Sequence, residues 1–572
     1  MRVSDYIVSY LQEKGIHAVF GYPGGMVTYL MDSLYKTPEI KNCLLYHEQG
    51  ASFAACGYGQ LLGTPTVAYA TSGPGATNLV TGIANAWFDS IPAVFITGQV
   101  NTSEAKTTEQ VRQKGFQETD IVDIVRSITK YAVQITDASR IQYELEKAFF
   151  LAQDGRMGPV LLDLPIDIMR KDVDPGQMAR FCPQCQEYDD PEESAGRLLS
   201  LLASAQRPCL LLGNGAHHVP GETIAAFIRR FDLPYVTSMP AVDLGALVPE
   251  NYYGFLGAYG ARVANQIMGR STLLISMGSR LDIRQTGFDS GMFASNATIF
   301  RIDVDSGELD NQIHADELRC HRDLNSTVRY LLDRPYRPGA HTIWKNQCAK
   351  AKELLSGFDR LEPNAVVEHF STLVPDRAVI TTDVGQNQVW VAQSFQVKPG
   401  QRILFSSGHG AMGYSLPAAI GAYYAGKSPV IAFCGDGGLQ MNIQEMQVLS
   451  RERLPVKIVL LNNYSLGMIR HFQEMYFQGS YAYTVGSGGY TTPDFLAVAS
   501  AYGVRALRYD AQQDDAVRGI LQDDEPALIE IALPFDTYVS PKGIYNAPLS
   551  FQSPELPSRV QEQIDRVFDA GA

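Results

Sequence analysis

The stretch from Val430 to Asn463 reads VIAFCGDGGLQMNIQEMQVLSRERLPVKIVLLNN, and its pattern decides the fold. It begins with an apolar run, 430–434, that has the length and composition of a buried strand. A helical pattern follows over 443–449, and a second apolar run, 456–461, ends at an asparagine pair. A strand, a helix and a second strand form a βαβ unit, whose right-handed crossover leaves both strands parallel. The sequence therefore predicts a parallel sheet, with the carboxyl ends of both strands at one edge.

Polar residues and glycines follow both strands. Asp436 lies between Gly435, Gly437 and Gly438 after the first strand, and Asn463 follows the second. If the strands are neighbours they lie roughly 5 Å apart, so Asp436 and Asn463 meet in the crevice where open α/β sheets bind ligands. A carboxylate, an amide oxygen and a loop carbonyl suit an octahedral cation, and the glycines let backbone N–H groups approach phosphate oxygens. The alternative is an ordinary strand-to-helix turn, which the asparagine pair disfavours. The pattern predicts a site for Mg²⁺ and a diphosphate.

Length and composition exclude several classes of protein. At 572 residues the chain is too long for one core and suggests about three to four domains. A hydrophobic content of 45% with 19% charged residues is typical of a globular protein, and a formal charge of −14 argues against nucleic-acid binding. The sequence has neither an apolar stretch of transmembrane length nor a signal-peptide pattern at its start. These features predict a cytoplasmic protein that binds neither nucleic acid nor membrane.

The two ends of the chain repeat one pattern around a different middle. Strands alternate with helical patterns in the N-terminal region, and the same alternation returns from about 378 to 534. The segments 72–76 and 407–411 each follow a strand and open a helix with a Ser-Gly-x-Gly-Ala pattern. The middle region has strands of its own at 208–213, 272–278 and 299–305. We therefore expect three doubly wound α/β domains, at 1–180, 190–340 and 355–540, followed by a C-terminal tail, 541–572.

These features together resemble the thiamine-diphosphate-dependent enzymes. The resemblance rests on the glycine-rich Asp436 segment with its asparagine pair, on the segment His47-Glu48-Gln49-Gly50-Ala51, and on the two similar halves. It is greatest for the acetohydroxyacid (acetolactate) synthase catalytic subunits and spans residues 1 to about 535. The matching segments are 71–83, 89–92, 96–100, 116–118 and 440–445. The resemblance implies that a pyrimidine-binding and a pyrophosphate-binding domain, related to each other, flank a central Rossmann-like domain.

The resemblance assigns Glu48 the role of activating the cofactor. A carboxylate against the pyrimidine N1′ drives the tautomer whose 4′-imino group takes the proton from C2. The small apolar residues at 51–55 favour burial of Glu48. Gly25 and Gln117 complete the implied catalytic set. In the family this glutamate meets a cofactor held mainly by the other subunit, which implies a homodimer or homotetramer with active sites at the subunit interface.

The resemblance also implies the residues around thiamine diphosphate and Mg²⁺. Met412 matches the bulky residue that holds thiamine in its bent shape, and Gly410 matches the carbonyl that accepts a hydrogen bond from the 4′-amino group. Asp436 and Asn463 would hold Mg²⁺, with the backbone carbonyl of Ser465 as third protein ligand. The full cofactor-binding set is Glu48, Pro23, Thr71, Asn78, Gln386, Gly410, Met412, Gly435, Gly437, Gly438 and Met468.

A second cofactor is implied for the middle domain. The segments 278–287 and 302–305 resemble the flavin-contacting segments of the synthases, where FAD is structural. The implied FAD residues are Arg280, Asp282, Arg284, Asp303 and Asp305. The alternative is a middle domain without flavin, as in several relatives, and Tyr259, where the synthases have histidine, fits that alternative.

The substrate residues leave the acceptor open. Simple 2-oxoacid decarboxylases carry a His-His pair that the segment 114–118 lacks, so carboligation is favoured over release of aldehyde, with pyruvate as the donor of a two-carbon hydroxyethyl unit. Arg280 matches an arginine that can bind an acceptor carboxylate, which favours a 2-oxoacid. Phe472, where the synthases have tryptophan, and the altered segment 538–546 fit a keto group on a nucleotide-linked deoxysugar equally well. The implied substrate residues are Phe116, Gln117, Arg280 and Phe472.

Two further functions are less favoured by the same residues. The missing histidine pair disfavours a simple 2-oxoacid decarboxylase. The joint presence of Glu48, Asp436 and Asn463 argues against a non-catalytic partner subunit. The sequence leaves a regulatory subunit open.

Overall fold

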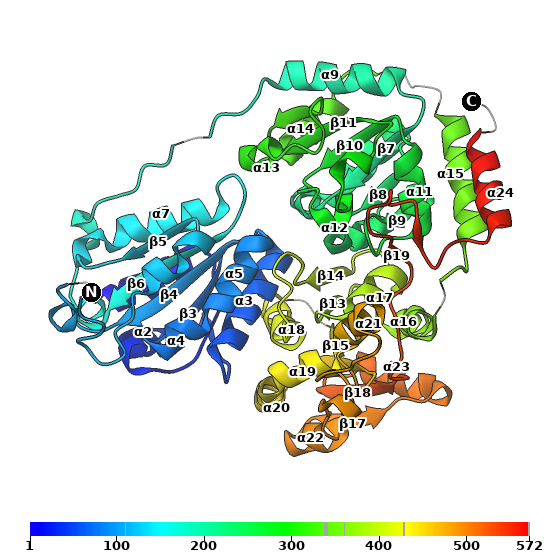
Figure 1. Ribbon diagram of the computed structural model, residues 1–572. Coiled ribbons are helices and arrows are strands. Elements are labelled where there is room, and N and C mark those ends of the chain that lie inside the picture. Colours follow the sequence, from blue (N-terminus) through cyan, green and yellow to red (C-terminus); the bar gives the residue numbers. More distant parts are fainter. Residues whose placement is uncertain (109, 185, 337–340, 360, 427–428, 570–572) are drawn as a thin grey trace. The chain divides into compact units, whose positions relative to one another are not determined.

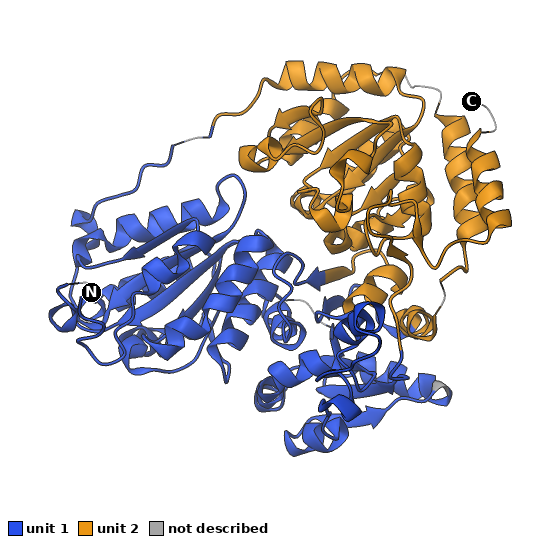
Figure 2. Cartoon of the chain, viewed as in Figure 1, with its two compact units in different colours: residues 1–186, 373–387, 404–536 blue, residues 187–372, 388–403, 537–572 orange. Residues whose placement is uncertain are grey.

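The computed structural model describes the chain except for residues 109, 185, 337–340, 360, 427–428 and 570–572, and except for the side chain of residue 511. The chain divides into two compact units (Figure 2). The first comprises 1–186, 373–387 and 404–536, and the second comprises 187–372, 388–403 and 537–572. The structure contains three six-stranded sheets with helices between the strands (Figure 1), which confirms the predicted α/β class with three doubly wound domains.

The N-terminal sheet has the strand order β2-β1-β3-β4-β6-β5, and its strands are parallel. β3, β4 and β6 are buried along their whole length, because helices cover a doubly wound sheet on both faces. The strands are β1 (Ala18–Gly21), β2 (Lys41–Leu44), β3 (Thr66–Ala70), β4 (Ala93–Gln99), β5 (Tyr131–Gln134) and β6 (Pro159–Pro165). The helices are α1 (Val3–Glu13), α2 (Thr28–Tyr35), α3 (Glu48–Leu62), α4 (Pro74–Asn78), α5 (Val80–Phe88), α6 (Ile121–Val125), α7 (Ile141–Gln153) and α8 (Ile166–Met169).

The C-terminal sheet repeats this arrangement. Its order is β14-β13-β15-β16-β18-β17, so that, counted along each sheet, both orders read 2-1-3-4-6-5. The strands are β13 (Val379–Thr382), β14 (Arg402–Phe405), β15 (Val430–Gly435), β16 (Val456–Asn462), β17 (Arg505–Arg508) and β18 (Ala527–Ala532). The helices are α16 (Glu362–Leu373), α17 (Gln386–Ser394), α18 (Ser415–Tyr424), α19 (Asp436–Met441), α20 (Met446–Glu452), α21 (Gly467–Tyr476), α22 (Phe495–Ala501) and α23 (Asp514–Gln522). The shared strand order indicates that the two halves are related.

The second unit holds the central sheet, with the order β12-β11-β10-β7-β8-β9. The order reverses between β7 and β10, which is the switch point where doubly wound sheets bind nucleotides. The strands are β7 (Pro208–Leu212), β8 (Tyr235–Thr237), β9 (Tyr252–Phe255), β10 (Leu273–Met277), β11 (Thr298–Asp303) and β12 (Leu318–His321). The helices are α9 (Pro191–Ser204), α10 (Gly221–Phe231), α11 (Arg262–Arg270), α12 (Ile283–Thr286), α13 (Ser306–Asp310), α14 (Leu324–Leu332) and α15 (Thr342–Leu355). The tail adds β19 (Lys542–Gly543), β20 (Gln552–Ser553) and α24 (Ser558–Asp569) to this unit.

Helices α3 and α18 bring the N-terminal and C-terminal sheets together in the first unit. A Cβ at Gly57 of α3 would lie 2.3 Å from the carbonyl oxygen of Ala418, and one at Gly421 of α18 would lie 1.8 Å from that of Ala54. Glycine is therefore required at both positions, because only glycine lets the two backbones approach this closely. Residues of both sheets share one hydrophobic core around this pair of helices. The packing fixes α3, which begins at Glu48, against the C-terminal sheet.

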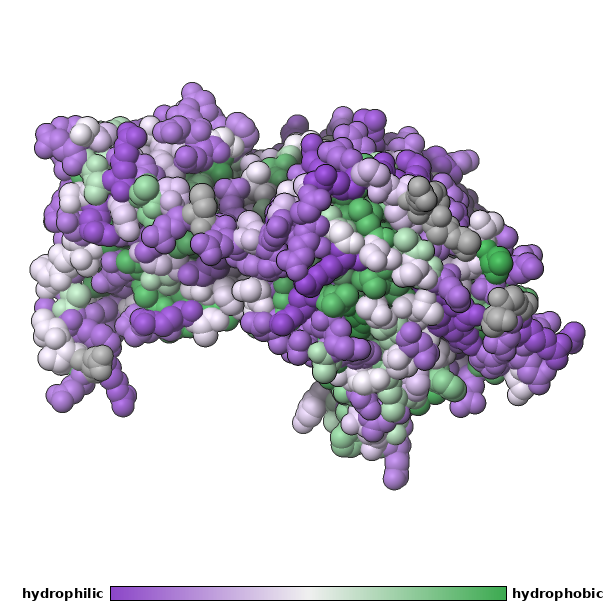
Figure 3. Space-filling view, turned by 90° about the horizontal axis from the view of Figure 1, so that it is seen from above, coloured by the Kyte–Doolittle hydropathy of each residue, from purple (hydrophilic) through white to green (hydrophobic). Residues whose placement is uncertain are grey.

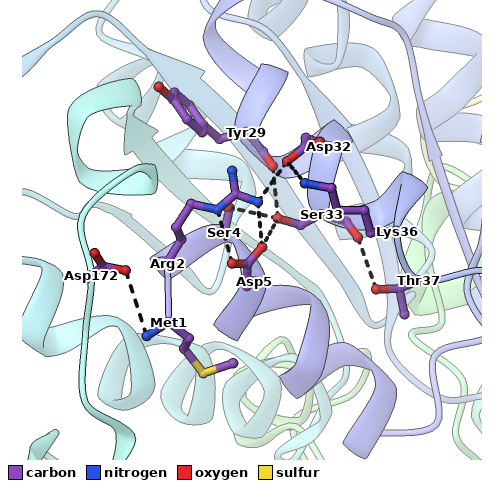
Figure 4. Close-up of polar contacts among 10 residues, drawn as sticks. All are labelled: Met1, Arg2, Ser4, Asp5, Tyr29, Asp32, Ser33, Lys36, Thr37 and Asp172. Carbon is purple, nitrogen blue, oxygen red and sulfur yellow. Dashed lines mark hydrogen bonds and ion pairs between the residues drawn. The ribbon is translucent and has the colours of Figure 1, made fainter.

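A polar network fixes the start of the chain (Figure 4). The guanidinium of Arg2 donates to Asp5 at 2.8 Å and to Asp32 at 2.8 Å, and so joins α1 to α2. The Ser33 hydroxyl donates to Asp5 at 2.7 Å. The hydrogen bonds from Arg2 lower the pKa of Asp5 to about 2. This lowered pKa favours the ionised form of the Asp5 carboxylate at acidic pH.

On the face shown in Figure 3, hydrophilic residues predominate and hydrophobic residues gather in separate groups. None of the helices in the described ranges is both long enough and apolar enough to cross a membrane.

Candidate active site

Glu48 is buried at the first position of α3. Only 8% of its surface is exposed, as its small apolar neighbours predict. Its Oε2 accepts a hydrogen bond of 2.9 Å from Nδ2 of Asn78, which ends α4. The preceding residue, His47, caps α3 through Nδ1, which accepts the N–H of Gln49 at 3.1 Å. A carboxylate is favourable at a helix N-terminus because the helix dipole and the unpaired N–H groups are positive there. Glu48 is thus held in place by its own helix and by Asn78.

The predicted N-terminal residues gather around Glu48. The Thr71 hydroxyl, at the end of β3, accepts the N–H of Met26 at 3.2 Å. A Cβ at Gly24 would lie 2.3 Å from Cβ of Thr71. At Gly75 a Cβ would lie 2.8 Å from Cγ2 of Thr71 and 3.2 Å from Oε1 of Glu48. The loop that carries Pro23 and Gly25 therefore lies against Thr71, and Thr71 lies near Glu48.

Gln117 lies beside the turn between β3 and α4 and has an unusual backbone conformation. Its φ is 64°, in the left-handed region that residues other than glycine seldom adopt. A Cβ at Gly73 would lie 2.9 Å from Cβ of Gln117, so the two segments touch. Such strained residues cluster at functional sites, which fits the predicted role. Phe116, by contrast, is 79% exposed.

The predicted metal ligands lie at the carboxyl ends of β15 and β16. These strands are parallel neighbours, with Gly435 opposite Leu461, as the sequence predicts. Asp436 is 3% exposed, and its Oδ1 accepts the N–H of Gly437 at 3.0 Å. Its Oδ2 is buried without a hydrogen-bond partner among the residues that the structure describes. Burial raises the pKa of Asp436 to about 6. A cation beside Oδ2 would compensate for this burial, so the donor set fits a metal ion.

The amide of Asn463 is oriented by a neighbouring glutamine. Its Nδ2 donates to Oε1 of Gln386 at 3.0 Å, so its carbonyl oxygen is directed elsewhere. Ser465 follows at 2% exposure, after Tyr464 with a φ of 54°. A Cβ at Gly467 would lie 2.0 Å from Oε1 of Gln386, so the start of α21 packs tightly on this pair. Asn463, Ser465 and Gln386 therefore belong to one cluster.

Two glycine-containing loops meet at this cluster. A Cβ at Gly437 would lie 3.2 Å from Cε of Met412, and one at Gly438 would lie 2.1 Å from Oδ1 of Asp383. The Asp383 carboxylate also accepts the N–H of Gly413 at 2.9 Å. The Gly410 loop, in which Gly410 has a φ of 68°, is thereby fixed against the Asp436 loop.

None of the contacts that the structure gives for Phe472 connects it with this cluster. It lies on α21 one turn after Met468, its side chain is 52% exposed, and its ring centroid is 4.6 Å from that of Tyr476. The structure therefore places Met468 near the cluster through the start of α21 and leaves Phe472 on the helix surface.

Hydrogen bonds connect the Glu48 region with the C-terminal cluster. Nδ2 of Asn442 donates to the carbonyl of Gly413 at 2.8 Å and to Oε1 of Gln49 at 3.4 Å. Farther along, the Asp89 carboxylate after α5 accepts the N–H of Gly408 at 2.7 Å. Gln49, Asp89 and Asn442 lie in the segments of the resemblance, but sequence reasoning assigned them no role, and it missed Asp383. Asp383 had a signal, because it follows β13 as Asp436 follows β15.

The predicted flavin residues lie in the second unit, at the carboxyl ends of β10 and β11. Arg280 pairs with Asp282 at 3.2 Å, and Oδ1 of Asp303 accepts the N–H of Asp305 at 3.0 Å. Arg284 is exposed, and its guanidinium lies 5.7 Å from the ring centroid of Tyr259.

Glycines line the switch point beside these residues. A Cβ at Gly213 would lie 2.1 Å from the carbonyl oxygen of Gly278, and one at Gly215 would lie 2.9 Å from Cα of Gly278. A switch point that admits no side chains fits a bound dinucleotide, whose diphosphate needs close approach of the backbone.

Comparisons with known proteins agree with this architecture. Three family models match the chain: "Thiamine pyrophosphate enzyme, N-terminal TPP binding domain" at 1–124, its central domain at 195–331, and its C-terminal TPP binding domain at 383–531. The chain is 35% identical over 548 residues to acetolactate synthase isozyme 2 large subunit of Escherichia coli (strain K12), covering 93% of this chain and 96% of the relative. It is 33% identical to the acetolactate synthase large subunit of Lactococcus lactis, covering 94% of this chain and 93% of the relative. It is also 33% identical to the chloroplastic acetolactate synthase of Arabidopsis thaliana, covering 94% and 82%. The chain is therefore a relative of the acetolactate synthase large subunits and an enzyme that forms C–C bonds, and it belongs to the thiamine pyrophosphate enzymes.

Proposed function

We propose that the protein decarboxylates pyruvate with Mg²⁺ and thiamine diphosphate and transfers the two-carbon hydroxyethyl unit to a second carbonyl compound. The observation that carries this proposal is the buried Glu48 carboxylate in the same unit as the buried, partly unpaired Asp436 carboxylate. Bound thiamine diphosphate supplies a carbon acid whose anion takes up and passes on the two-carbon unit. Glu48 holds and moves the proton at the pyrimidine N1′, with Asn78 fixing its other oxygen.

The C-terminal cluster would bind the metal and the diphosphate. Asp436 offers Oδ2, Asn463 its amide oxygen and Ser465 its backbone carbonyl, which are the hard oxygen ligands that Mg²⁺ prefers. Diphosphate oxygens and water would supply the other ligands of the metal. Met412 and Gly410 would position the pyrimidine end.

The acceptor is proposed to be a 2-oxoacid, as in an acetolactate synthase. A keto group on a nucleotide-linked deoxysugar is the second candidate, and the exposed ring of Phe472 favours it because an open helix surface accommodates a larger acceptor. The test is to incubate the purified protein with Mg²⁺, thiamine diphosphate and pyruvate, alone and with each class of acceptor. Mass spectrometry of the products identifies the ligated compound. A product from pyruvate or another 2-oxoacid supports the first candidate, and one from the keto sugar alone supports the second.

Replacing Phe472 with tryptophan should change the preference between acceptors. A larger ring at an apolar contact with the acceptor changes binding by only a few kcal/mol, so the ratio of kcat/KM values for two acceptors should shift by roughly 10- to 200-fold. Competition assays with two acceptors measure this ratio. Pyruvate decarboxylation should hardly change, because the variant leaves Glu48 untouched. Tyr35→Trp, at an exposed aromatic residue that ends α2, is the control. An unchanged acceptor ratio with altered pyruvate consumption would place Phe472 on the donor side.

FAD is proposed as a structural cofactor of the second unit. The glycines at 213, 215 and 278 and the acidic pair Asp303 and Asp305 support this, because they lie at the switch point of the central sheet and beside it. The protein should therefore copurify with a flavin absorbance, and Arg280→Ala should reduce the flavin content. A colourless preparation that takes up no flavin and is fully active would contradict this.

The assembly is proposed to be a homodimer or homotetramer with active sites at the subunit interface. The 79% exposure of Phe116, a predicted substrate residue, supports this because a substrate pocket needs a second wall over that ring. A cytoplasmic location stays a prediction from the sequence.

A further inference from the structure

Glu445 is a buried carboxylate that neither the predicted metal site nor the proposed catalysis uses. It ends the 3₁₀ helix Ile443–Glu445, which follows α19, and none of its surface is exposed. Its two carboxylate oxygens accept the backbone N–H of Tyr46, at 3.1 and 3.0 Å. Tyr46 lies two residues before Glu48. A carboxylate from the C-terminal half of the chain is therefore bound directly in front of α3.

The charge of Arg451 acts on this carboxylate only from a distance, without forming an ion pair with it. Glu445 forms no ion pair within the part of the chain that the structure describes. Burial raises its pKa to about 7, and backbone N–H groups of Tyr46 and His47 oppose that rise. Burying a carboxylate is costly unless hydrogen bonds compensate for it, so these contacts are the ones that hold it in place. Apart from a longer hydrogen bond from Nε2 of Gln444 at 3.4 Å, the groups that donate to Glu445 are thus the N–H groups that lead into α3.

Gly50 makes this approach possible. It lies in the first turn of α3, and a Cβ there would lie 2.6 Å from Oε1 of Glu445 and 3.1 Å from its Cδ. Glycine lowers the stability of a helix relative to alanine, and the contact with Glu445 explains why a glycine nevertheless occupies this position. Because the nearest atoms are the end of a flexible side chain, a methyl group at 50 would displace the Glu445 carboxylate rather than the backbone.

We propose that Glu445 is a positioning residue for Glu48, which fixes the Tyr46–His47 backbone and the first turn of α3 so that the activating carboxylate keeps its place. The inference rests on the proposed role of Glu48. Asn78 holds the Glu48 side chain, and Glu445 holds the backbone from which that side chain extends. The arrangement applies whichever subunit holds the cofactor that Glu48 activates, because Glu445 and Glu48 belong to one chain. A displacement of about 1 Å at a reacting group is enough to reduce rates by about a hundredfold.

The first test uses two variants and one control. Glu445→Ala removes both acceptors, and Glu445→Gln keeps one oxygen that can accept the Tyr46 N–H. The control is Glu452→Gln, on α20, whose carboxylate pairs with Lys41 at 2.6 Å across the same contact between the two halves. Amide hydrogen–deuterium exchange of residues 46–50 is measured on the protein without cofactor. The C2 proton exchange rate of bound thiamine diphosphate is measured by quenched-flow NMR.

Glu445→Ala should speed amide exchange at residues 46–50 and slow C2 exchange by about 10- to 100-fold, with thiamine diphosphate affinity changed less than about threefold. In Glu445→Gln, both the amide exchange and the C2 exchange should be close to those of the unaltered protein. Glu452→Gln should resemble the unaltered protein in both measurements. Normal amide and C2 exchange in Glu445→Ala would overturn the proposal. So would a loss of C2 exchange with unchanged amide exchange, because the effect would then not pass through α3. Normal C2 exchange in Glu48→Gln would instead contradict the proposed function itself.

A second test keeps the proposal falsifiable if Glu445→Ala does not fold. Gly50→Ala alone should slow C2 exchange by about tenfold, because its methyl group displaces the Glu445 carboxylate. If the two positions act through one contact, Gly50→Ala should slow C2 exchange by a clearly smaller factor in the Glu445→Gln background. Equal, independent effects of Gly50→Ala in both backgrounds would show that Glu445 is not what the glycine accommodates.

Discussion

Glu48→Gln is expected to lower kcat by at least about a hundredfold while the protein keeps its fold and binds thiamine diphosphate. That is the usual scale for loss of a general acid–base group. Glutamine has the size of glutamate and can still meet Nδ2 of Asn78, which lies 2.9 Å from Oε2 in the structure. It cannot take up or release the proton at N1′. Steady-state kinetics give kcat, and calorimetry gives the dissociation constant of the cofactor.

The control for this variant is Glu39→Gln, an exposed glutamate of the same half of the chain. It should leave both quantities unchanged. Near-normal turnover in Glu48→Gln would mean that another group activates the cofactor, and the assigned mechanism would be wrong.

Asp436→Ala is expected to abolish Mg²⁺-dependent binding of thiamine diphosphate. Asp436 is the only anionic residue among the three predicted metal ligands, and its loss leaves two neutral oxygens to face a dication and a diphosphate. The protein itself should remain folded, because the contacts of this carboxylate are local to the site: its Oδ1 accepts the N–H of Gly437 at 3.0 Å, and Tyr490 and the backbone of Ser465 lie near enough to lower its pKa. Titration calorimetry with and without Mg²⁺ measures the loss.

Asp524→Ala, at an exposed aspartate of the same half, is the matched control and should bind cofactor normally. Unchanged affinity in Asp436→Ala would show that the metal is held elsewhere. Mixed subunits extend the experiment: if active sites form between chains, mixing Glu48→Gln with Asp436→Ala should restore part of the activity that each lacks alone.

The C-terminal part of the site could be predicted from sequence because buried parallel strands have a simple sequence pattern. β15 and β16 are buried on both faces, so each appears as an unbroken apolar run, and whatever follows two neighbouring strands lies at one edge. That reasoning placed Asp436 beside Asn463 and gave the fold class. It also predicted that Glu48 is buried, since small apolar residues follow it.

Contacts between distant segments could not be predicted in the same way. Glu445 reaches Tyr46 across 399 positions of the chain, and Asp89 reaches Gly408 across 319. Nothing in the local pattern of either segment indicates its partner. The reason for Gly57 is equally non-local, because the carbonyl that excludes a side chain there belongs to Ala418. Such residues become interpretable only once α3 and α18 are seen to pack.

The central claim is that decarboxylation is coupled to formation of a C–C bond, and a carbon balance tests it most directly. The enzyme is supplied with ¹³C-labelled pyruvate, Mg²⁺, thiamine diphosphate and the preferred acceptor, and CO₂, free acetaldehyde and ligated product are counted together. We predict one molecule of ligated product for each CO₂ released, with little acetaldehyde. Acetaldehyde released in the same amount as CO₂, with no ligated product, would contradict the account.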